Sequence, residues 1–332
     1  MTDRRILVTG GAGFIGSHIV EDLLLHGYDV TVLDNLSSGR RENLAAVSRD
    51  VRFVEGDLAD GNLLARAMRG QRFVSHMAAQ LEIIRCSKDP LADLDANTVA
   101  TLRVLNAAVE AGLDKMVNAS SACVYGQAVH VPASEDGHPK NPNWAYGVSK
   151  LAAEHYCRLF HESGRLATTS LRFAIVYGQR EWCGRVITMM LRRALRGLPP
   201  VVFGAGDQSR DFIHVDDVVR CHRLALESDA ANGLPFNVST GIGTDVSTLA
   251  GLCAEVTGLG QPPIFEDTAQ GETSQAMPDR VRLPQELHTM ILDPTRANQL
   301  LGFRAETLLR TGLAREWAWI RKQPDRWNSL SI

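Results

Sequence analysis

The sequence predicts an α/β fold: a doubly wound parallel sheet with a smaller, partly discontinuous α/β subdomain towards the C-terminus. Three observations support this. Short β-rich apolar runs alternate with longer helix-like stretches through the first half, a glycine-rich turn joins the first run to the first helix, and a strand-like run, "PFNVS" (235–239), follows a section rich in Gly and Pro. Such alternation is typical of βαβ units around a parallel sheet that helices cover on both faces.

The first half supplies most of the expected strands, at 5–9, 28–34, 51–57, 73–79, 115–121 and 167–173. The stretch 15–27 is expected to be the first helix, and 307–323 an amphipathic helix near the end. Because 235–239 suits the first sheet, we expect the chain to cross back to it. We therefore predict one domain at 1–177 plus 213–240 and a second at 178–212 plus 241–332.

The amino-acid composition excludes several classes of function. The net charge of −3 and the lack of a long basic block argue against nucleic acid or an anionic membrane as partner. The six cysteines are scattered without paired spacing, which predicts a reducing compartment, no disulfide framework and no metal site. With no apolar segment that resembles a signal or a membrane span, we expect a cytoplasmic protein.

The stretch "VTGGAGFIGSH" (8–18) directly follows the first expected strand and opens a helix. Gly10, Gly13 and Gly16 are spaced three apart, with Phe14 and Ile15 between the last two. Missing side chains allow a tight turn, close approach of a pyrophosphate and tight packing of helix on strand, and the helix N-terminus presents N–H groups to the anion. An ordinary glycine-rich turn is the alternative, but the strand–turn–helix context favours a Rossmann-type dinucleotide site.

Asp34 ends the second expected strand, 18 residues after Gly16. A carboxylate there accepts both ribose hydroxyls of NAD and repels the additional phosphate of NADP. Arg40 and Arg41 lie close by, and arginines suit a 2′-phosphate, so NADP remains open; both could also belong to a solvated helix start. NAD is the predicted cofactor.

The stretch "WAYGVSKLAAEH" (144–155) resembles the start of a helix, which places Tyr146 and Lys150 on one face. A nearby cation favours the phenolate, so we expect Lys150 to lower the pKa of Tyr146 and make it a base. Ser121, at the end of an expected strand, can hydrogen-bond the same substrate oxygen. Alternatively Tyr146 is a core aromatic and Lys150 a surface charge. The combination with the glycine loop favours proton removal coupled to hydride transfer.

With these motifs, the chain resembles an extended short-chain dehydrogenase/reductase of the nucleotide-sugar epimerase/dehydratase family. The similar stretches run through most of the sequence: TGGAGFIGSH (9–18), LDNLSSG (33–39), GDL (56–58), HMAAQ (76–80), SSACVYG (120–126), YGVSK (146–150), LRFAIVYG (171–178), FGAGDQSRDFIHVDD (203–217) and ILDPTRANQLLGF (291–303). The resemblance implies an NAD-binding Rossmann domain, a nucleotide-sugar-binding subdomain and a nucleotide-sugar substrate.

The resemblance also implies roles for individual residues. The further cofactor-binding residues would be Asn35, Ser37, Ser38, Gly39, Asp57 and Leu58 (the last two at the adenine), Ala78, Ala79, Gln80, Asn97 and Phe173. Lys150 would also bind the nicotinamide ribose. On the substrate side, Phe203 would stack on a pyrimidine base, and Arg210 and Arg282 would bind the diphosphate. A plain surface charge is the alternative for Arg282.

Ala122 and Cys123 limit which reactions of this family the chain can catalyse. Family members that eliminate water from the sugar carry an acid–base carboxylate pair there, and decarboxylating relatives tend to carry a glutamate where Cys123 stands. Alanine cannot transfer a proton, and a thiol is a poor acid for this task. We therefore expect a C4 epimerase, an isomerase that acts by transient oxidation to a 4-keto sugar. A net oxidoreductase and a non-catalytic cofactor sensor are the alternatives. The presence of Ser121, Tyr146 and Lys150, called the triplet below, argues against the sensor.

The substrate is less well defined. Ile175 stands where the family often has Asn, so a hydrogen bond to the nucleotide sugar is missing or replaced. Arg180 and Arg185 lie near the expected sugar pocket, and we hypothesise that Arg185 reads a C6 carboxylate; binding of phosphate or solvent is the alternative. UDP-glucose/UDP-galactose and UDP-glucuronate/UDP-galacturonate are both candidate pairs. By resemblance, helices at 92–112 and 146–162 would form a homodimer interface, unless they only cover the sheet.

Overall fold

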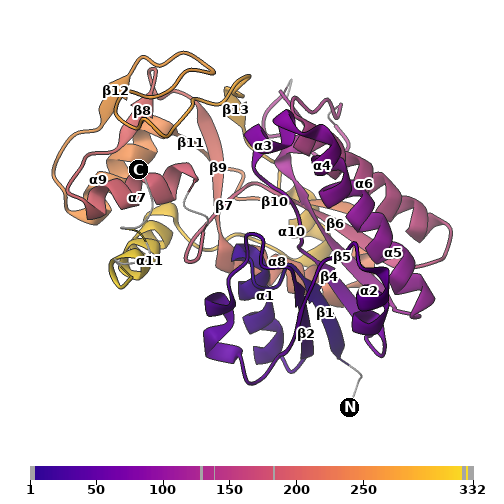
Figure 1. Cartoon of the computed structure of the whole chain (residues 1–332). Coiled ribbons are helices and arrows are strands. Elements are labelled where there is room, and N and C mark those ends of the chain that lie inside the picture. Colours follow the sequence, from indigo (N-terminus) through magenta and orange to yellow (C-terminus); the bar gives the residue numbers. More distant parts are fainter. Residues whose placement is uncertain (1–3, 128–129, 138, 182–183, 324–326, 328–332) are drawn as a thin grey trace.

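The computed structural model describes residues 4–127, 130–137, 139–181, 184–323 and 327. Its centre is a seven-stranded sheet in the order β10-β6-β5-β4-β1-β2-β3, in which every neighbouring pair is parallel (Figure 1). The strands are β1 (Arg5–Thr9), β2 (Asp29–Asp34), β3 (Arg52–Glu55), β4 (Phe73–His76), β5 (Lys115–Ser121), β6 (Ala167–Phe173) and β10 (Pro235–Val238).

The strands are apolar on both faces because helices cover both sides. On β1, Ile6 and Val8 belong to one buried cluster and Leu7 to another. This is the alternation of side chains across a pleated strand, with neither face left to water. The two clusters lie on opposite sides of the sheet, so the core forms two layers.

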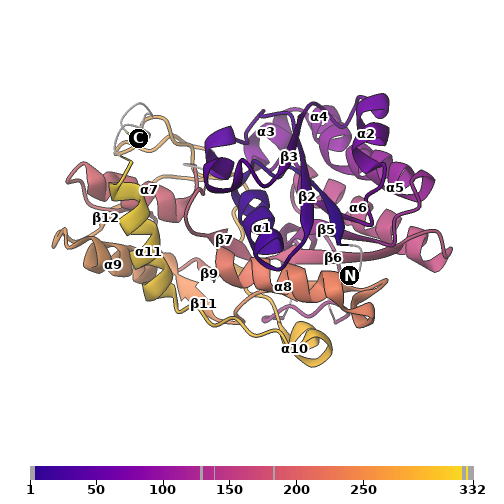
Figure 2. The ribbon, with the colours of Figure 1, turned by 90° about the horizontal axis from the view of Figure 1, so that it is seen from below.

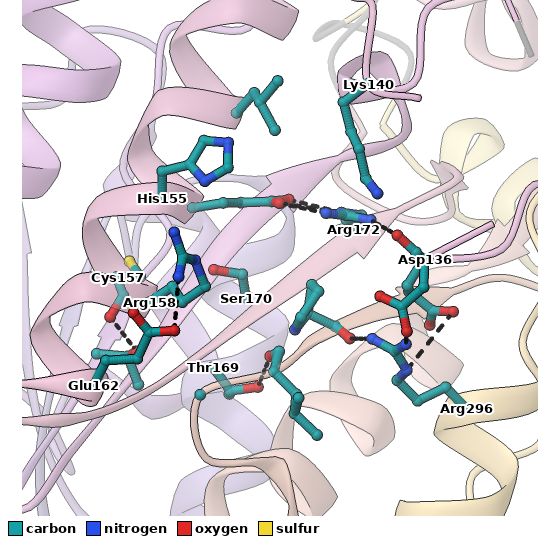
Figure 3. A pocket seen from close by; sticks show the side chains of 17 residues that line it. Asp136, Lys140, His155, Cys157, Arg158, Glu162, Thr169, Ser170, Arg172 and Arg296 are labelled. Atoms are coloured by element: carbon teal, nitrogen blue, oxygen red, sulfur yellow. Dashed lines mark hydrogen bonds and ion pairs between the residues drawn. The ribbon is translucent and has the colours of Figure 1, made fainter. Parts of the chain in front are cut away.

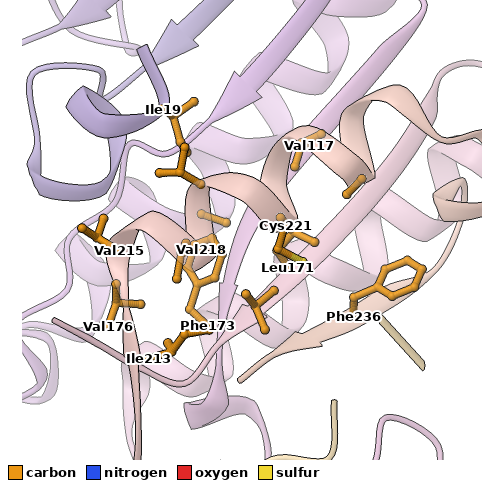
Figure 4. Packing of buried hydrophobic residues seen from close by; sticks show 14 of the residues in the cluster. Ile19, Val117, Leu171, Phe173, Val176, Ile213, Val215, Val218, Cys221 and Phe236 are labelled. Atoms are coloured by element: carbon orange, nitrogen blue, oxygen red, sulfur yellow. The ribbon is translucent and has the colours of Figure 1, made fainter. Parts of the chain in front are cut away.

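One face is covered by α1 (Phe14–Leu25) and α8 (Val215–Glu227), which lie side by side (Figure 2). Ile19 of α1 and Val218 of α8 pack with Leu171 and Phe173 of β6 (Figure 4). The other face is covered by α2 (Gly61–Met68), α5 (Ala100–Glu110) and α6 (Ala145–Glu162). The smaller elements around this sheet are η1 (Arg41–Val47), α3 (Ile83–Lys88), α4 (Pro90–Leu94), η2 (Asp95–Val99), η3 (Ala122–Val124), η4 (Asp229–Ala231) and α10 (Thr295–Leu301).

A second sheet begins directly after β6. In it β9 (Ser209–His214) pairs with β7 (Ile175–Tyr177), β11 (Gly243–Asp245) and β13 (Thr289–Met290). A separate two-stranded sheet pairs β8 (Val201–Phe203) with β12 (Ile264–Glu266). Helices α7 (Val186–Leu195), α9 (Val246–Thr257) and α11 (Leu309–Arg321) surround these strands (Figure 1). A third apolar cluster, which includes Tyr177, Leu191 and Leu249, forms the core of this part.

The predicted fold class is confirmed, and all seven expected strands belong to the large sheet. The residue bounds of the two predicted domains stay a prediction. The expected helix at 92–112 differs in one respect: α4 and α5 are joined by a π-helical turn, η2, which contains Asn97. Such turns insert a residue into a helix and often occur at functional sites.

Cys183 lies outside the described residues, and the other five cysteines are free and buried. None of the described helices combines the length and the apolar character that crossing a bilayer requires. Within the same residues, no group of three or more His, Cys, Asp and Glu side chains is arranged to hold a metal ion.

A buried ion pair joins α6 to the central sheet. The Arg172 guanidinium on β6 donates to Glu154 on α6, with an Nη2–Oε2 distance of 2.6 Å, and both side chains are less than a tenth exposed. Arg172 also donates to the Tyr125 hydroxyl at 2.8 Å. The pair lines a cavity of about 370 Å³, into which Lys140 and Asp136 also point (Figure 3). None of the predicted site residues lines this cavity.

Breaking this pair should destabilise the protein, because removing one partner leaves an uncompensated buried charge. We expect Glu154→Gln to lower the free energy of unfolding by about 3 kcal/mol or more. The matched control is Glu162→Gln on the same helix, since Glu162 pairs with Arg158 at 2.6 Å but both side chains are about half exposed. That change should cost less than about 1 kcal/mol. Urea unfolding of the two variants compares them, and equal shifts in midpoint would contradict the expectation.

Candidate active site

The predicted site residues gather at the carboxyl ends of the parallel strands. Gly10 follows β1, Asp34 ends β2, Ala78 follows β4, and Ser121 and Phe173 end β5 and β6, where they are register neighbours. Strand β1 lies between β2 and β4, so the chain order reverses direction at this point of the sheet. In open parallel sheets, ligands bind outside the carboxyl ends of the strands at such a reversal.

The glycine loop packs too closely for side chains. Gly10 has φ +68°, and a Cβ there would lie 2.6 Å from the Ala78 nitrogen; at Gly16 it would lie 2.1 Å from the Gly10 oxygen. Gly13 precedes α1 and provides no side chain to cap it. The first N–H groups of a helix, here those of Phe14, Ile15 and Gly16, have no partner within the helix and attract an anion. This open, close-packed turn fits the pyrophosphate of a dinucleotide.

Asp34 is held firmly at the end of β2. Its carboxylate accepts from the backbone N–H of Ala12 at 2.9 Å and of Leu36 at 2.8 Å, and burial raises its pKa. A Cβ at Gly39 would lie 2.8 Å from an Asp34 oxygen, so the chain passes directly over the carboxylate. The two backbone bonds fix the carboxylate in an orientation suited to ribose hydroxyls.

Of the two arginines that left NADP open, Arg41 is already paired. Arg41 Nη2 lies 2.6 Å from Glu55 Oε2, and its guanidinium covers the Phe53 ring at 4.3 Å. Of the further residues implied near the adenine, Asn35 donates to Asp57 at 2.7 Å, which lowers the Asp57 pKa together with the Ala59 N–H. Ser37 donates its N–H to Asn35, Ser38 is exposed, and Leu58 packs against the second apolar cluster. These contacts favour NAD over NADP.

Asn97 anchors the loop of Ala78, Ala79 and Gln80. Its Oδ1 accepts from the Gln80 N–H at 3.1 Å and its Nδ2 donates to the Gln80 oxygen at 3.0 Å. The same Nδ2 donates to Asp93 at 2.7 Å, and the Ser149 hydroxyl donates to the other Asp93 oxygen. Sequence reasoning missed Asp93, a buried carboxylate that joins the π-helical turn to the residue before Lys150. Its only sequence signal is its spacing of four before Asn97.

The three predicted catalytic residues are brought together. Tyr146 lies in the first turn of α6, and the Ser121 side chain is close enough to its hydroxyl to lower the Tyr146 pKa. Ser121 also accepts from the Cys123 N–H at 3.1 Å, which fixes its orientation. Lys150 is 2% exposed, donates to the Ala119 oxygen at 2.9 Å, and its Nζ lies 5.8 Å from the Tyr146 ring centroid. Lys150 is therefore no surface charge, and Tyr146 remains partly accessible.

The expected lowering of the Tyr146 pKa is not produced by the protein's own groups. Burial raises the Tyr146 pKa, and the opposing influences come from the Arg185 guanidinium and the Ser121 side chain. The reason is that Lys150 directs its ammonium to the Ala119 oxygen. Burial also lowers the Lys150 pKa to about 8. The phenol thus holds its proton until another positive charge approaches.

Ala122 and Cys123 are both buried beside Ser121, in η3. Burial raises the Cys123 pKa, against weaker influences from the Ser121 hydroxyl and the Arg185 and Arg210 guanidinium groups. The thiol therefore stays protonated at neutral pH. Arg185 also lies close enough to Tyr146 to affect its pKa.

Arg180 and Arg185 lie apart. Arg185 precedes α7, is one third exposed, and its Nε lies 3.9 Å from Glu181 Oε1. Arg180 instead turns to α1, where it pairs with Glu21 at 2.6 Å and donates to Ser17. Arg180 has φ +70° and its side chain contacts the cofactor helix, while the expectation that both arginines lie near the sugar pocket stays a prediction.

The arginines predicted for the diphosphate share a carboxylate. Arg210 Nη2 lies 3.5 Å and Arg282 Nε 3.2 Å from opposite oxygens of Glu286. Arg282 is 14% exposed and borders Gly204, the residue after Phe203, so it is no surface charge. Burial lowers the Arg210 pKa. Phe203 is half-buried at the end of β8.

Comparisons with known proteins agree with this geometry. Residues 6–239 match the NAD dependent epimerase/dehydratase family. The UDP-glucose 4-epimerase of Mycolicibacterium smegmatis is 35% identical over 326 residues, which cover 96% of this chain and 99% of that protein. The structure of a Thermotoga maritima UDP-glucose 4-epimerase with UDP-glucose is similar with a TM-score of 0.87 and 35% identity, covering 96% and 99% of the two chains.

A Thermus thermophilus UDP-glucose 4-epimerase in complex with NAD is similar with a TM-score of 0.84 and 34% identity, again over 96% and 99% of the two chains. The predicted family, the NAD cofactor and the enzyme class, an epimerase, are thereby confirmed. With the family match extending over more than half of its length, the chain belongs to the NAD-dependent epimerase/dehydratase family.

Proposed function

We propose that the protein is a nucleotide-sugar C4 epimerase that interconverts UDP-glucose and UDP-galactose, or UDP-glucuronate and UDP-galacturonate, through a transient 4-keto sugar. The observation that carries the proposal is the combination of Ser121, Tyr146 and Lys150 with Ala122 and Cys123 at the same edge of the sheet. The triplet suits oxidation of an alcohol, and the two neighbours lack the groups for a subsequent elimination. The relatives named above support this substrate class.

The cofactor residues fit one dinucleotide in an extended arrangement. The open N-terminus of α1 would hold the pyrophosphate and Asp34 the adenine-side ribose, with Asp57 and Leu58 at the adenine. Ala78 to Gln80, supported by Asn97, would line the nicotinamide side, and Phe173 would back it from the core. When bound, NAD supplies the acceptor and donor of the C4 hydrogen. Because the C4 hydrogen is taken up and then returned, the cofactor is unchanged over a full cycle.

Tyr146 would act as the base on the C4 hydroxyl, because its partly accessible phenol stands at the strand ends beside Ser121. Its pKa is raised although Lys150 and Arg185 are nearby, so it needs further positive charge to give up its own proton, and the nicotinamide of bound NAD would supply that charge. Ser121 would hold the same substrate oxygen by a hydrogen bond. In the return half of the cycle the phenol gives the proton back to the oxygen of the inverted sugar.

Phe203, Arg210 and Arg282 would hold the nucleotide. Glu286 keeps both guanidinium groups at one place, and a diphosphate can take over the positions of its two oxygens. This arrangement lets the sugar turn over while the nucleotide stays bound. Inversion requires such freedom because the planar keto sugar must present its other face.

We also propose a cytoplasmic homodimer. Four apolar side chains on α4 and α6 are exposed although they lie on helices of the central domain: Leu91, Leu94, Val148 and Leu159 are 78, 43, 54 and 49% exposed. Because α4 and α6 contact each other, exposed apolar side chains on both helices favour a second copy as partner.

Replacing the proposed base should remove turnover. Tyr146→Phe keeps the ring but lacks the hydroxyl, and we expect kcat to fall by at least about 100-fold, the usual effect of losing a general base. Tyr156→Phe on the same helix is the matched control, because Tyr156 is 39% exposed and distant from the triplet, and it should retain activity. Undiminished turnover by Tyr146→Phe on all UDP-sugars would reject the mechanism.

The fate of the cofactor separates an epimerase from a net oxidoreductase. Incubation with UDP-sugar and free NAD should invert C4, seen by NMR, without accumulation of NADH at 340 nm (roughly its absorbance maximum). Denaturing the purified protein should release NAD. Stoichiometric NADH formation without C4 inversion would favour the oxidoreductase.

Arg185 tests the choice of sugar. If its guanidinium binds a C6 carboxylate, Arg185→Ala should reduce kcat/KM for UDP-glucuronate by about 10-fold more than for UDP-glucose, since one charge-assisted hydrogen bond is lost. Arg185→Lys should recover part of the difference. An equal relative loss on both sugars would contradict carboxylate recognition and leave UDP-glucose as the favoured substrate.

A further inference from the structure

Arg180 has an unusual backbone. Its φ of +70° lies in the left-handed region, which side chains other than glycine rarely adopt. Among the described residues other than glycine, only Leu36 and Gln285 share this property. Such a conformation persists when surrounding contacts over-determine it, and it is a reason to look for a function.

The contacts around Arg180 are directed at a single helix. Arg180 Nη2 lies 2.6 Å from Glu21 Oε1, and Nη1 donates to the Ser17 hydroxyl at 3.1 Å. The preceding residue, Gln179, accepts from His18 Nε2 at 2.9 Å, and burial with the Arg180 charge lowers the His18 pKa, so the ring stays neutral. Three consecutive contacts therefore fasten residues 179–180 to α1.

This attachment lies next to the proposed pyrophosphate site. Ser17 follows Gly16 and donates its hydroxyl to the Phe14 oxygen at 3.0 Å, within the first turn of α1. The Arg180 and Glu21 side chains are 18 and 28% exposed, so their interaction is less screened than that of a surface pair.

At the other end of residues 179–181, Glu181 contacts residues close to the triplet. Glu181 is 1% exposed and accepts from the Thr188 hydroxyl on α7, and its Oε1 lies 3.9 Å from Arg185 Nε. Arg185 in turn is close enough to lower the Tyr146 pKa against burial. A continuous set of contacts thus runs from the cofactor helix through Arg180 and Glu181 to Arg185.

We propose that Arg180 is a positioning residue that locks residues 179–181 onto α1 and thereby sets where Arg185 stands relative to Tyr146 and the bound cofactor. The proposal rests on the proposed function for its catalytic consequence. Its structural part, that Arg180 holds α1 and the segment together, does not. A residue with a merely structural role would change stability without changing local protection of α1 or turnover by the folded enzyme.

The test uses Arg180→Asn, because asparagine tolerates a positive φ but cannot reach Glu21. The matched control is Arg310→Asn, since Arg310 pairs with Glu255 at 2.5 Å on the exposed surface of the second subdomain. Glu21→Gln is a milder second variant in case Arg180→Asn folds poorly. Arg180→Lys should restore part of each effect.

Two measurements on the NAD-loaded protein test whether Arg180 has this positioning role. Hydrogen–deuterium exchange should become several-fold faster at residues 14–21 and 178–181 in Arg180→Asn, and NAD should dissociate faster. The kcat for the UDP-sugar should fall by about 10- to 100-fold with a smaller change in KM, as expected when reacting groups are misplaced. The control should leave all of these unchanged.

The proposal would be overturned if hydrogen–deuterium exchange at residues 14–21 is unchanged in Arg180→Asn, even if thermal stability falls. If that variant does not fold, the same result in Glu21→Gln would overturn it. Faster exchange with wild-type kcat would also overturn it, because the segment would then not position the reaction. If the wild-type protein inverts none of the UDP-sugars, the proposed function fails, while exchange and NAD dissociation still decide whether Arg180 holds the cofactor helix.

Discussion

The arrangement of the candidate site at the carboxyl ends of the strands depends on how closely the Gly10 backbone packs. It lies against Ala78 on one side and Gly16 on the other. A Cβ at either glycine would overlap backbone atoms, which cannot move without displacing β4 or α1. This contact sets the direction in which α1 leaves the sheet. The open helix N-terminus, the Ser17 hydroxyl and Glu21 take their positions from it. The nucleotide loop thus also determines where the substrate-side segment at Arg180 can attach.

Burial controls the chemistry of the triplet more strongly than charge pairing does. Lys150 is almost fully buried and Tyr146 partly so, and burial moves the lysine pKa down and the tyrosine pKa up. Both shifts favour the neutral forms, because a low-dielectric surrounding disfavours any isolated charge. The same surrounding strengthens the influence of a positive charge that comes close. In the proposed reaction, a phenol in this setting would act as a base only when the substrate and the cofactor are in place.

Much of this site could be predicted from sequence because the requirements are local. The glycine spacing, Asp34 at a strand end and the i, i+4 pair of Tyr146 and Lys150 each express a backbone or helical constraint within a few residues. The remainder depends on distant contacts. Asp93 gains its role only when the π-helical turn packs on α6, and the direction of Arg180 follows from a positive φ that no residue type at this position signals. The Tyr146 pKa could not be predicted because it follows from burial rather than from the neighbouring ammonium.

The carboxylates of the predicted site are engaged by other groups, which agrees with a reaction that uses a single base. Asp34 accepts two backbone N–H groups, Asp93 holds Asn97 and Ser149, Glu181 is bound by Thr188, and Glu286 lies between two arginines. Cys123 keeps its proton because it is buried. Ala122 and Cys123 offer no carboxylate beside Ser121, so Tyr146 would be the group that exchanges a proton with the C4 oxygen in the proposed reaction. Elimination needs a second acid–base group, whereas oxidation at C4 followed by its reversal moves the same proton out and back. The distribution of carboxylates favours the reversible reaction.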